Sequence, residues 1–144
     1  MAVFLGLFGH PDIGTLEMNR DFVGLSRILI HEKSRELRSE AAAALGRIGD
    51  ERAIQPLLSA LRHEDGEVRM FAADALGNLG YPQAVEPLIN VLEDQNYMIR
   101  EAAAKALGKL NDVRAIEPLK RILDDTYEEV RRTAEKALDN ICDE

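Results

Sequence analysis

The residues that could support chemistry in this sequence are few, and the histidines come first. The sequence contains His10, His31 and His63, and no serine or cysteine stands at a spacing from them that is typical of a nucleophile and its base. Two histidines precede a glutamate, as His31-Glu32 and His63-Glu64, and these pairs lie 32 residues apart. Imidazole and carboxylate both bind metals, so a repeated pair of this kind has to be tested as a metal site.

The elements that must position these residues repeat at a fixed interval. Leucine, alanine and arginine each recur at a step of 31 residues, at Leu45, Leu76, Leu107 and Leu138, at Ala41, Ala72, Ala103 and Ala134, and at Arg38, Arg69, Arg100 and Arg131. Between these positions, apolar residues are spaced by three and four, which is typical of amphipathic helices. The sequence therefore predicts an all-α fold, an α-solenoid of four helix pairs with a short N-terminal cap.

Each pair is predicted to contain a first and a second helix. The first helices are expected near residues 21–31, 52–62, 83–93 and 114–124, and the second near 36–48, 67–79, 98–110 and 128–141. Pro56, Pro87 and Pro118 fall a few residues inside first helices, which predicts a distorted first turn. Gly49 and Gly80 are placed to end second helices in a left-handed cap.

Glycine also recurs inside the second helices, at Gly46, Gly77 and Gly108. Glycine in a helix interior costs about 1 kcal/mol relative to alanine. Its recurrence makes physical sense if the backbone of the next repeat packs closely at these positions. We therefore predict that this flank of the second helices forms the contact between repeats.

Several short phrases give the chain a resemblance to a known family. They are Val68-Arg69, Ile99-Arg100 and Val130-Arg131 with their Ala-Leu-Gly endings, and Asp94 and Asp125 after the first helices. With these phrases the chain resembles the HEAT-repeat family over residues 21–141, in the short 31-residue form of phycobilin-lyase-type proteins. The resemblance implies an armadillo/HEAT-like superhelix with second helices on the concave face, and a ladder of aspartate and arginine between repeats. His63 occupies the ladder position that matches Asp94, so the ladder is expected to depart there.

The resemblance also bears on the His-Glu pairs. Deoxyhypusine hydroxylase, a similar helical-repeat enzyme, holds iron with His-Glu pairs on second helices, immediately before the alanine-rich run. The matching positions here are Ser39-Glu40, Met70-Phe71, Glu101-Ala102 and Arg132-Thr133, which cannot form such a site. We interpret His31 and His63 as solvated residues of the loops before the second helices. The sequence thus predicts no metal, no cofactor and no enzymatic activity.

A cluster of apolar residues is the remaining functional signal. When the repeats are aligned with one another, the position of Phe71 is occupied by Glu40 in the first repeat, and the position of Met98 is occupied by Glu67 in the second. These positions are mostly polar in the other repeats. Large apolar groups gathered on adjacent repeats favour a contact site. The alternative is that neighbouring repeats tilt and these side chains cover each other. The predicted site for a protein or peptide partner lies in the concave groove and comprises Met70, Phe71, Asp74, Tyr97, Met98 and Glu101.

Charge narrows the class of partner. The chain has 26 acidic and 18 basic residues and a net charge of -8, which repels phosphate backbones and anionic lipids. Nucleic-acid and membrane-surface binding are therefore disfavoured. Basic residues at Lys105, Lys109, Arg132 and Lys136 are interspersed with glutamates, and we interpret them as a mixed solvated face. Cys142 is the single cysteine, which fits a reducing, cytoplasmic location.

We expect residues 1–20 to form an N-terminal capping segment and residues 21–144 to form a single repeat domain, with repeats near 21–48, 52–79, 83–110 and 114–141. The apolar leader Phe4, Leu5, Leu7 and Phe8 is predicted to cover the open end of the first repeat. The function favoured by the sequence is a protein-interaction or scaffold module. The alternatives are a bilin-lyase-like subunit or chaperone, which the resemblance implies, and a structural protein that self-assembles through the leader.

Overall fold

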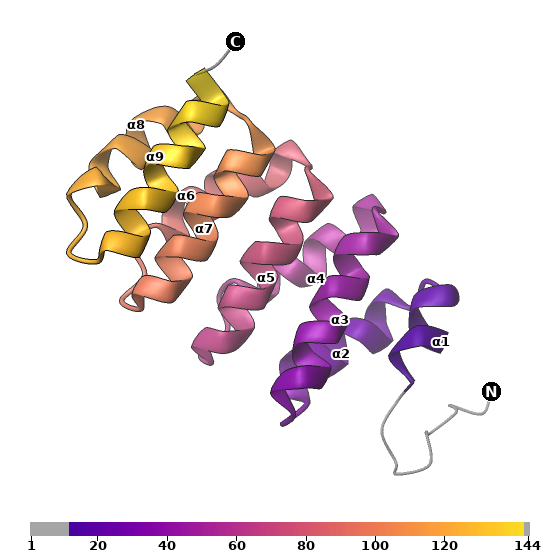
Figure 1. The fold of residues 1–144 in the computed structure, drawn as a ribbon. Helices are drawn as coiled ribbons and strands as arrows, with labels where there is room; N and C mark the ends of the chain where they lie inside the picture. Colours follow the sequence, from indigo (N-terminus) through magenta and orange to yellow (C-terminus); the bar gives the residue numbers. More distant parts are fainter. Residues whose placement is uncertain (1–11, 143–144) are drawn as a thin grey trace.

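The computed structural model describes residues 12–142, which form a row of helix pairs stacked side by side (Figure 1). A short helix, α1 (Ile13–Met18), precedes the pairs. The pairs are α2 (Phe22–His31) with α3 (Arg35–Ile48), α4 (Ile54–Ala60) with α5 (Gly66–Leu79), α6 (Val85–Val91) with α7 (Tyr97–Leu110), and α8 (Ile116–Arg121) with α9 (Glu128–Cys142). The second helices begin and end within one residue of their predicted bounds. The all-α solenoid predicted from the repeats is confirmed.

The first helices of the last three pairs begin irregularly, as the prolines predict. Short 3-10 helices, η1 (Glu51–Ala53), η2 (Pro82–Ala84) and η3 (Val113–Ala115), precede α4, α6 and α8, and η4 (Ile122–Asp124) follows α8. Each internal proline is the third residue of its α-helix, where the missing amide costs no intrahelical hydrogen bond. The second helices α3 and α5 end at Gly49 and Gly80 with φ of 65° and 76°, the predicted left-handed caps.

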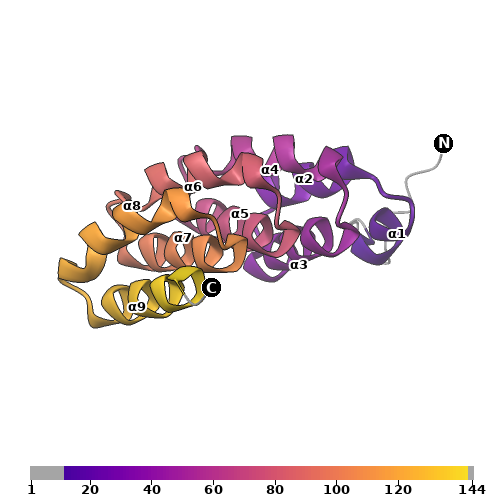
Figure 2. The ribbon, with the colours of Figure 1, turned by 90° about the horizontal axis from the view of Figure 1, so that it is seen from above.

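The helices lie in two layers, with α2, α4, α6 and α8 in one and α3, α5, α7 and α9 in the other (Figure 2). The row bends toward the second layer, so the second helices line the concave face. They also make the most extensive contacts between neighbouring repeats, α3 with α5, α5 with α7, and α7 with α9. Leucines of both layers, including Leu57, Leu76 and Leu88, are completely or almost completely buried between the layers.

The glycine flank forms the contact between second helices, as predicted. A Cβ atom at Gly77 would lie 2.8 Å from the Cα of Ala106, and one at Gly108 would lie 3.0 Å from the Cα of Ala137. Both distances are too short for a side chain unless the neighbouring helix moves. At Gly46 the nearest atom would be the Cβ of Asn78 at 3.5 Å, an ordinary van der Waals contact. The α3–α5 contact is therefore looser than the two that follow it.

Helix α1 packs against α2 and α3 at the N-terminal end of the described array. Its Ile13 is buried, and Glu17 accepts two hydrogen bonds from Arg47 on α3, both at 2.8 Å. Met18 points to solvent and is 86% exposed. His10 and the predicted leader contacts of residues 4–8 lie outside the described residues, so capping and self-assembly through the leader stay predictions.

Candidate functional site

Four of the six predicted site residues surround one hollow on the concave face. Met70 and Asp74 on α5 and Met98 and Glu101 on α7 line a depression of about 220 Å³. Met98 is 46% exposed at its rim, while Met70 is partly covered by the core beneath it. The hollow thus offers a thioether surface flanked by two carboxylates.

Phe71 does not join them, and the prediction that it is exposed is wrong. The side chain is 8% exposed and belongs to the hydrophobic core. Helix α5 has α3 on one side and α7 on the other, so a residue beside its core-facing side chains, such as Val68 and Leu76, is covered by a neighbouring helix. Ala102, the copy of Phe71 one repeat later, is likewise buried. At these two positions the side chain is therefore part of the packing between repeats, whereas the equivalent Glu40 in the first repeat is exposed.

Tyr97 is also engaged within the protein. Its ring stacks on that of Tyr127, one repeat further on, with centroids 4.1 Å apart and planes inclined by 9°. The Arg100 guanidinium lies over the Tyr127 ring at 5.9 Å from its centroid. Phe71 and Tyr97 thus pack within the protein, Phe71 in the core and Tyr97 on Tyr127, and the predicted patch is reduced to the rim of the hollow.

A second hollow, of about 360 Å³, lies between α7 and α9 and was missed by the sequence analysis. Its lining residues are Glu101, Lys105, Gly108, Lys109, Thr133, Lys136, Ala137 and Asn140. Glu101 and Lys105 line both hollows, so the two depressions adjoin across α7 and form one concave groove. The available signal was the lysine at two equivalent positions, Lys105 and Lys136, one repeat apart.

Partial desolvation and the charged residues of the groove change the pKa of Asp74. Asp74 is exposed, yet surrounding protein atoms partly desolvate its carboxyl group, which raises its pKa. Lys105 and Lys109 act in the opposite direction, and the charge of Glu101 raises the pKa of Asp74 further. Lys109 Nζ donates to Asn78 Oδ1 at 2.6 Å, which ties α7 to α5. The α5 side of the groove is therefore acidic and the α7–α9 side basic.

The ladder of arginine–aspartate pairs implied by the family resemblance joins the later repeats near the N-terminal ends of the second helices. Arg69 Nε donates to Asp94 Oδ2 at 2.9 Å, and Arg100 Nε donates to Asp125 Oδ2 at 2.8 Å. Each arginine also donates through Nη1 to two carbonyl oxygens of the loop before its own helix. The hydrogen bond from Arg100 lowers the pKa of Asp125.

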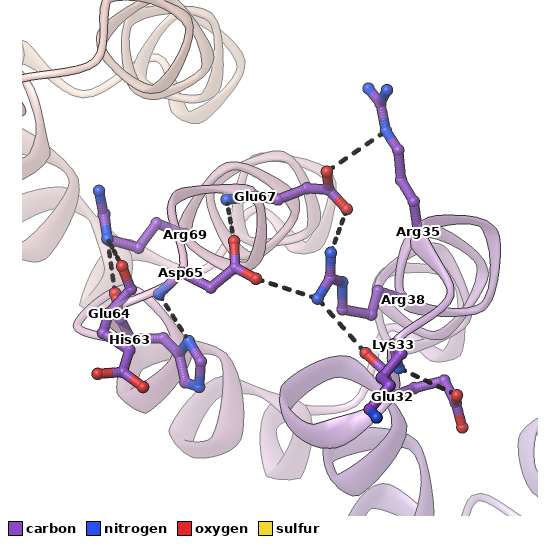
Figure 3. A network of polar contacts seen from close by, with 9 residues as sticks. All are labelled: Glu32, Lys33, Arg35, Arg38, His63, Glu64, Asp65, Glu67 and Arg69. Carbon is purple, nitrogen blue, oxygen red and sulfur yellow. Dashed lines mark hydrogen bonds and ion pairs between the residues drawn. The ribbon is translucent and has the colours of Figure 1, made fainter.

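The first step of the ladder departs at His63, as expected (Figure 3). His63 Nδ1 accepts the backbone amide of Asp65 at 3.0 Å, a local bond that matches the one from Asn96 to Asp94 at 2.9 Å. The His63 imidazole does not accept a hydrogen bond from Arg38, the arginine of the preceding repeat. Arg38 instead donates to the carboxylates of Asp65 and Glu67, and its buried Nε has no hydrogen-bond partner.

The other candidates for chemistry are the two histidines within the described residues, His31 and His63. His31 is the exposed last residue of α2 rather than a loop residue, whereas His63 does lie in the loop after α4. Within residues 12–142, no cluster of three or more histidine, cysteine, aspartate or glutamate side chains is arranged to hold a metal ion. None of the helices in the described part of the chain has the length and apolar character needed to cross a membrane.

Similar solved structures include enzymes and designed binders. Human deoxyhypusine hydroxylase is 30% identical over 87% of this chain and 44% of its own, with a TM-score of 0.74. The CpcE and CpcF complex of phycocyanin lyase from Nostoc gives 26% identity, 92% and 57% coverage, and a TM-score of 0.73. Computationally designed armadillo repeat proteins for modular peptide recognition give 25% identity, 90% and 68% coverage, and a TM-score of 0.60.

These similarities correct the prediction that the protein is not an enzyme. Two of the similar structures are a hydroxylase and a lyase, so this fold and this level of similarity are compatible with an enzymatic role. The chain spans 44% and 57% of those two solved chains. A catalytic site built largely outside the matched region would leave no motif within it, so the missing motif was not evidence against an enzyme.

The sequence comparisons agree with the repeat geometry. No curated protein matches the chain significantly. The family model described as HEAT repeats matches residues 54–139, more than half of the chain, and that described as PBS lyase HEAT-like repeat matches residues 37–63. With the two helical layers, the 31-residue columns and the arginine ladder, these matches show that the chain belongs to the HEAT-repeat family.

Proposed function

We propose that this protein is an interaction module that binds a segment of a partner protein in the concave groove of α5, α7 and α9. One observation carries the proposal, the two adjoining hollows that share Glu101 and Lys105 on α7. Together they form a depression across three successive second helices. A segment lying there would contact several repeats at once, which is how solenoids use their concave surfaces.

The groove contains both kinds of contact that such binding needs. Met98 and Met70 supply a flexible, polarizable surface that adapts to an apolar side chain. The charged residues around them can orient the segment and fix its register. The likeness to armadillo repeat proteins designed for modular peptide recognition supports the same mode of binding.

A selection from a library of randomised peptides tests the proposal. We expect peptides that bind the wild-type protein and lose roughly thirtyfold in affinity on Met98→Glu, because an apolar anchor would face a charge. Met18→Glu is the matched control, since Met18 is an exposed methionine on α1, away from the groove. Amide NMR shifts on binding should map to α5, α7 and α9. Peptides that shift only α2, α4, α6 or α8, or that are insensitive to Met98→Glu, would contradict the proposal.

A second candidate is a subunit or chaperone of the bilin-lyase type. It is favoured by the 26% identity to the phycocyanin lyase structure over 92% of this chain and by the PBS lyase repeat match. Titration of the purified protein with a free bilin is the direct test. A shift of the bilin absorbance that saturates at stoichiometric protein would support this role, and an unchanged spectrum would contradict it.

A further inference from the structure

The basic half of the groove points to the chemistry of the partner. Resting on the proposed function, we infer that the groove selects an acidic protein segment. Its carboxylates contact Lys105, Lys109 and Lys136, while a neighbouring apolar side chain sits against Met70 and Met98.

The pairing of charges is the first argument. The chain has 26 acidic and 18 basic residues, so carboxylates are in excess. Among the described residues, the ion pairs involve arginines and Lys120 but none of the three groove lysines. Glu101 and Lys105 are one helical turn apart on α7 and still form no ion pair; Glu101 instead accepts a hydrogen bond from the hydroxyl of Thr133 at 3.4 Å. Lys105 and Lys136 are thus available to an external anion, and Lys109, which donates one hydrogen bond to Asn78, keeps two further N–H donors.

The mixture of charges in the site favours the separated carboxylates of a peptide over the closely spaced charges of a phosphate chain. Three ammonium groups on two helices surround a hollow of about 360 Å³ that also contains the carboxylate of Glu101. A phosphate chain carries a charge at every unit and would bring some of them against Glu101. A peptide can place separated carboxylates at the lysines and leave a neutral residue opposite Glu101.

The spacing along α7 gives the segment a pattern. Lys105 and Lys109 follow Met98 by seven and eleven residues, or about 10 and 16 Å at the helical rise of about 1.5 Å per residue. An extended peptide advances about 3.3 Å per residue. A segment that crosses α5, α7 and α9 must cover at least this axial distance, so its acidic residues should lie at least about three to five positions from the apolar anchor.

The test is a peptide selection on charge-matched variants of the full chain. Lys105→Glu with Lys136→Glu reverses two groove lysines, and Lys33→Glu with Lys120→Glu changes the net charge equally outside the groove. We expect wild-type protein and the control to enrich aspartate and glutamate near an apolar residue, and the groove variant to lose this enrichment. Acidic peptides should bind the groove variant about tenfold or more weakly, and their affinity for wild type should fall with added salt. Lysine-substituted versions of the same peptides should bind the groove variant better than wild type, which also verifies that the variant is folded.

Three outcomes would overturn the inference. Peptides that depend on Met98 but show no acidic enrichment would leave the proposed function standing and remove the acidic partner. Equal loss of binding in the control would assign the effect to net charge rather than to the groove. Tighter binding of a short DNA oligonucleotide or of polyphosphate than of any selected peptide, lost on reversing Lys105 and Lys136, would replace the peptide with a phosphate ligand.

Discussion

The altered ladder step at Arg38 gives a sharp test of what the ladder contributes to stability. Arg38 precedes His63 by 25 residues, the same separation that joins Arg69 to Asp94. We predict that His63→Asp stabilises the protein by supplying the acceptor that Arg38 Nε lacks. The aspartate should also keep the bond from the Asp65 amide, because Asp94 accepts the equivalent amide of Asn96.

The magnitude follows from two opposing effects. A buried donor without a partner costs about 1–3 kcal/mol, and the Arg38 side chain is only 13% exposed. Against this gain, the new carboxylate stands near Asp65 and Glu67, which already accept hydrogen bonds from Arg38. Because partly exposed ion pairs contribute about 1 kcal/mol or less, we expect a net gain of about 1 kcal/mol in the free energy of unfolding.

Urea denaturation of both variants measures the effect. The converse substitution, Asp94→His, keeps a local acceptor but removes the partner of Arg69, and it should cost about 1–3 kcal/mol. If His63→Asp is neutral or destabilising while Asp94→His is costly, then Asp65 and Glu67 already satisfy Arg38, and the reasoning from its Nε is wrong. If both substitutions are neutral, the ladder does not stabilise the array.

Four further substitutions test the packing and the ladder. In urea denaturation, Gly77→Ala should lower the free energy of unfolding by about 1–2 kcal/mol because the new Cβ would meet the backbone of α7. Gly46→Ala should be neutral, or should stabilise by up to about 1 kcal/mol because alanine has the higher helix propensity. Equal effects of the two substitutions would contradict the packing argument. Phe71→Ala should cost about 3 kcal/mol or more as a core truncation, and a loss under about 1 kcal/mol would restore the exposed position. The lowered pKa of Asp125 means that its bond to Arg100 stabilises the fold above the ordinary pKa of 3.8 and is lost as the pH falls through the lowered value. Asp125→Asn should therefore lower stability near neutral pH, and its difference from wild type should shrink below pH 3.8; a difference independent of pH would exclude the charge as its source.

The repeat period is the reason that so much of the fold could be predicted. A residue type that recurs every 31 positions reports a shared environment, so one helix assignment is checked by three others. The α5 prediction, for example, was supported by the copies that became α3, α7 and α9. The prolines and Gly49 and Gly80 then fixed where elements begin and end, because their backbone limits are local.

The groove was harder to predict because its walls belong to different helices. A helical wheel describes one helix in isolation. On the wheel of α5, Phe71 falls outside the apolar stripe formed by Val68, Ala72, Ala75, Leu76 and Leu79. The crossing of α3 and α7 against α5 decides its burial, and no local pattern gives that crossing. The aligned repeats were a better guide at Met70 and Met98. The other repeats have mostly polar residues at these two positions, and both methionines do line a hollow.

The first junction between repeats is the more loosely packed one, and this bears on where a partner binds. At the α3–α5 junction Gly46 makes only an ordinary contact, and Arg38 has a donor without an acceptor. At the later junctions an added Cβ on the glycine would lie 2.8 or 3.0 Å from the next backbone, and the arginine Nε donates to an aspartate. In an array whose stability is the sum of repeat and neighbour terms, the later repeats then form the more cooperative block. The proposed groove spans α5, α7 and α9, so it lies across the two more closely packed junctions.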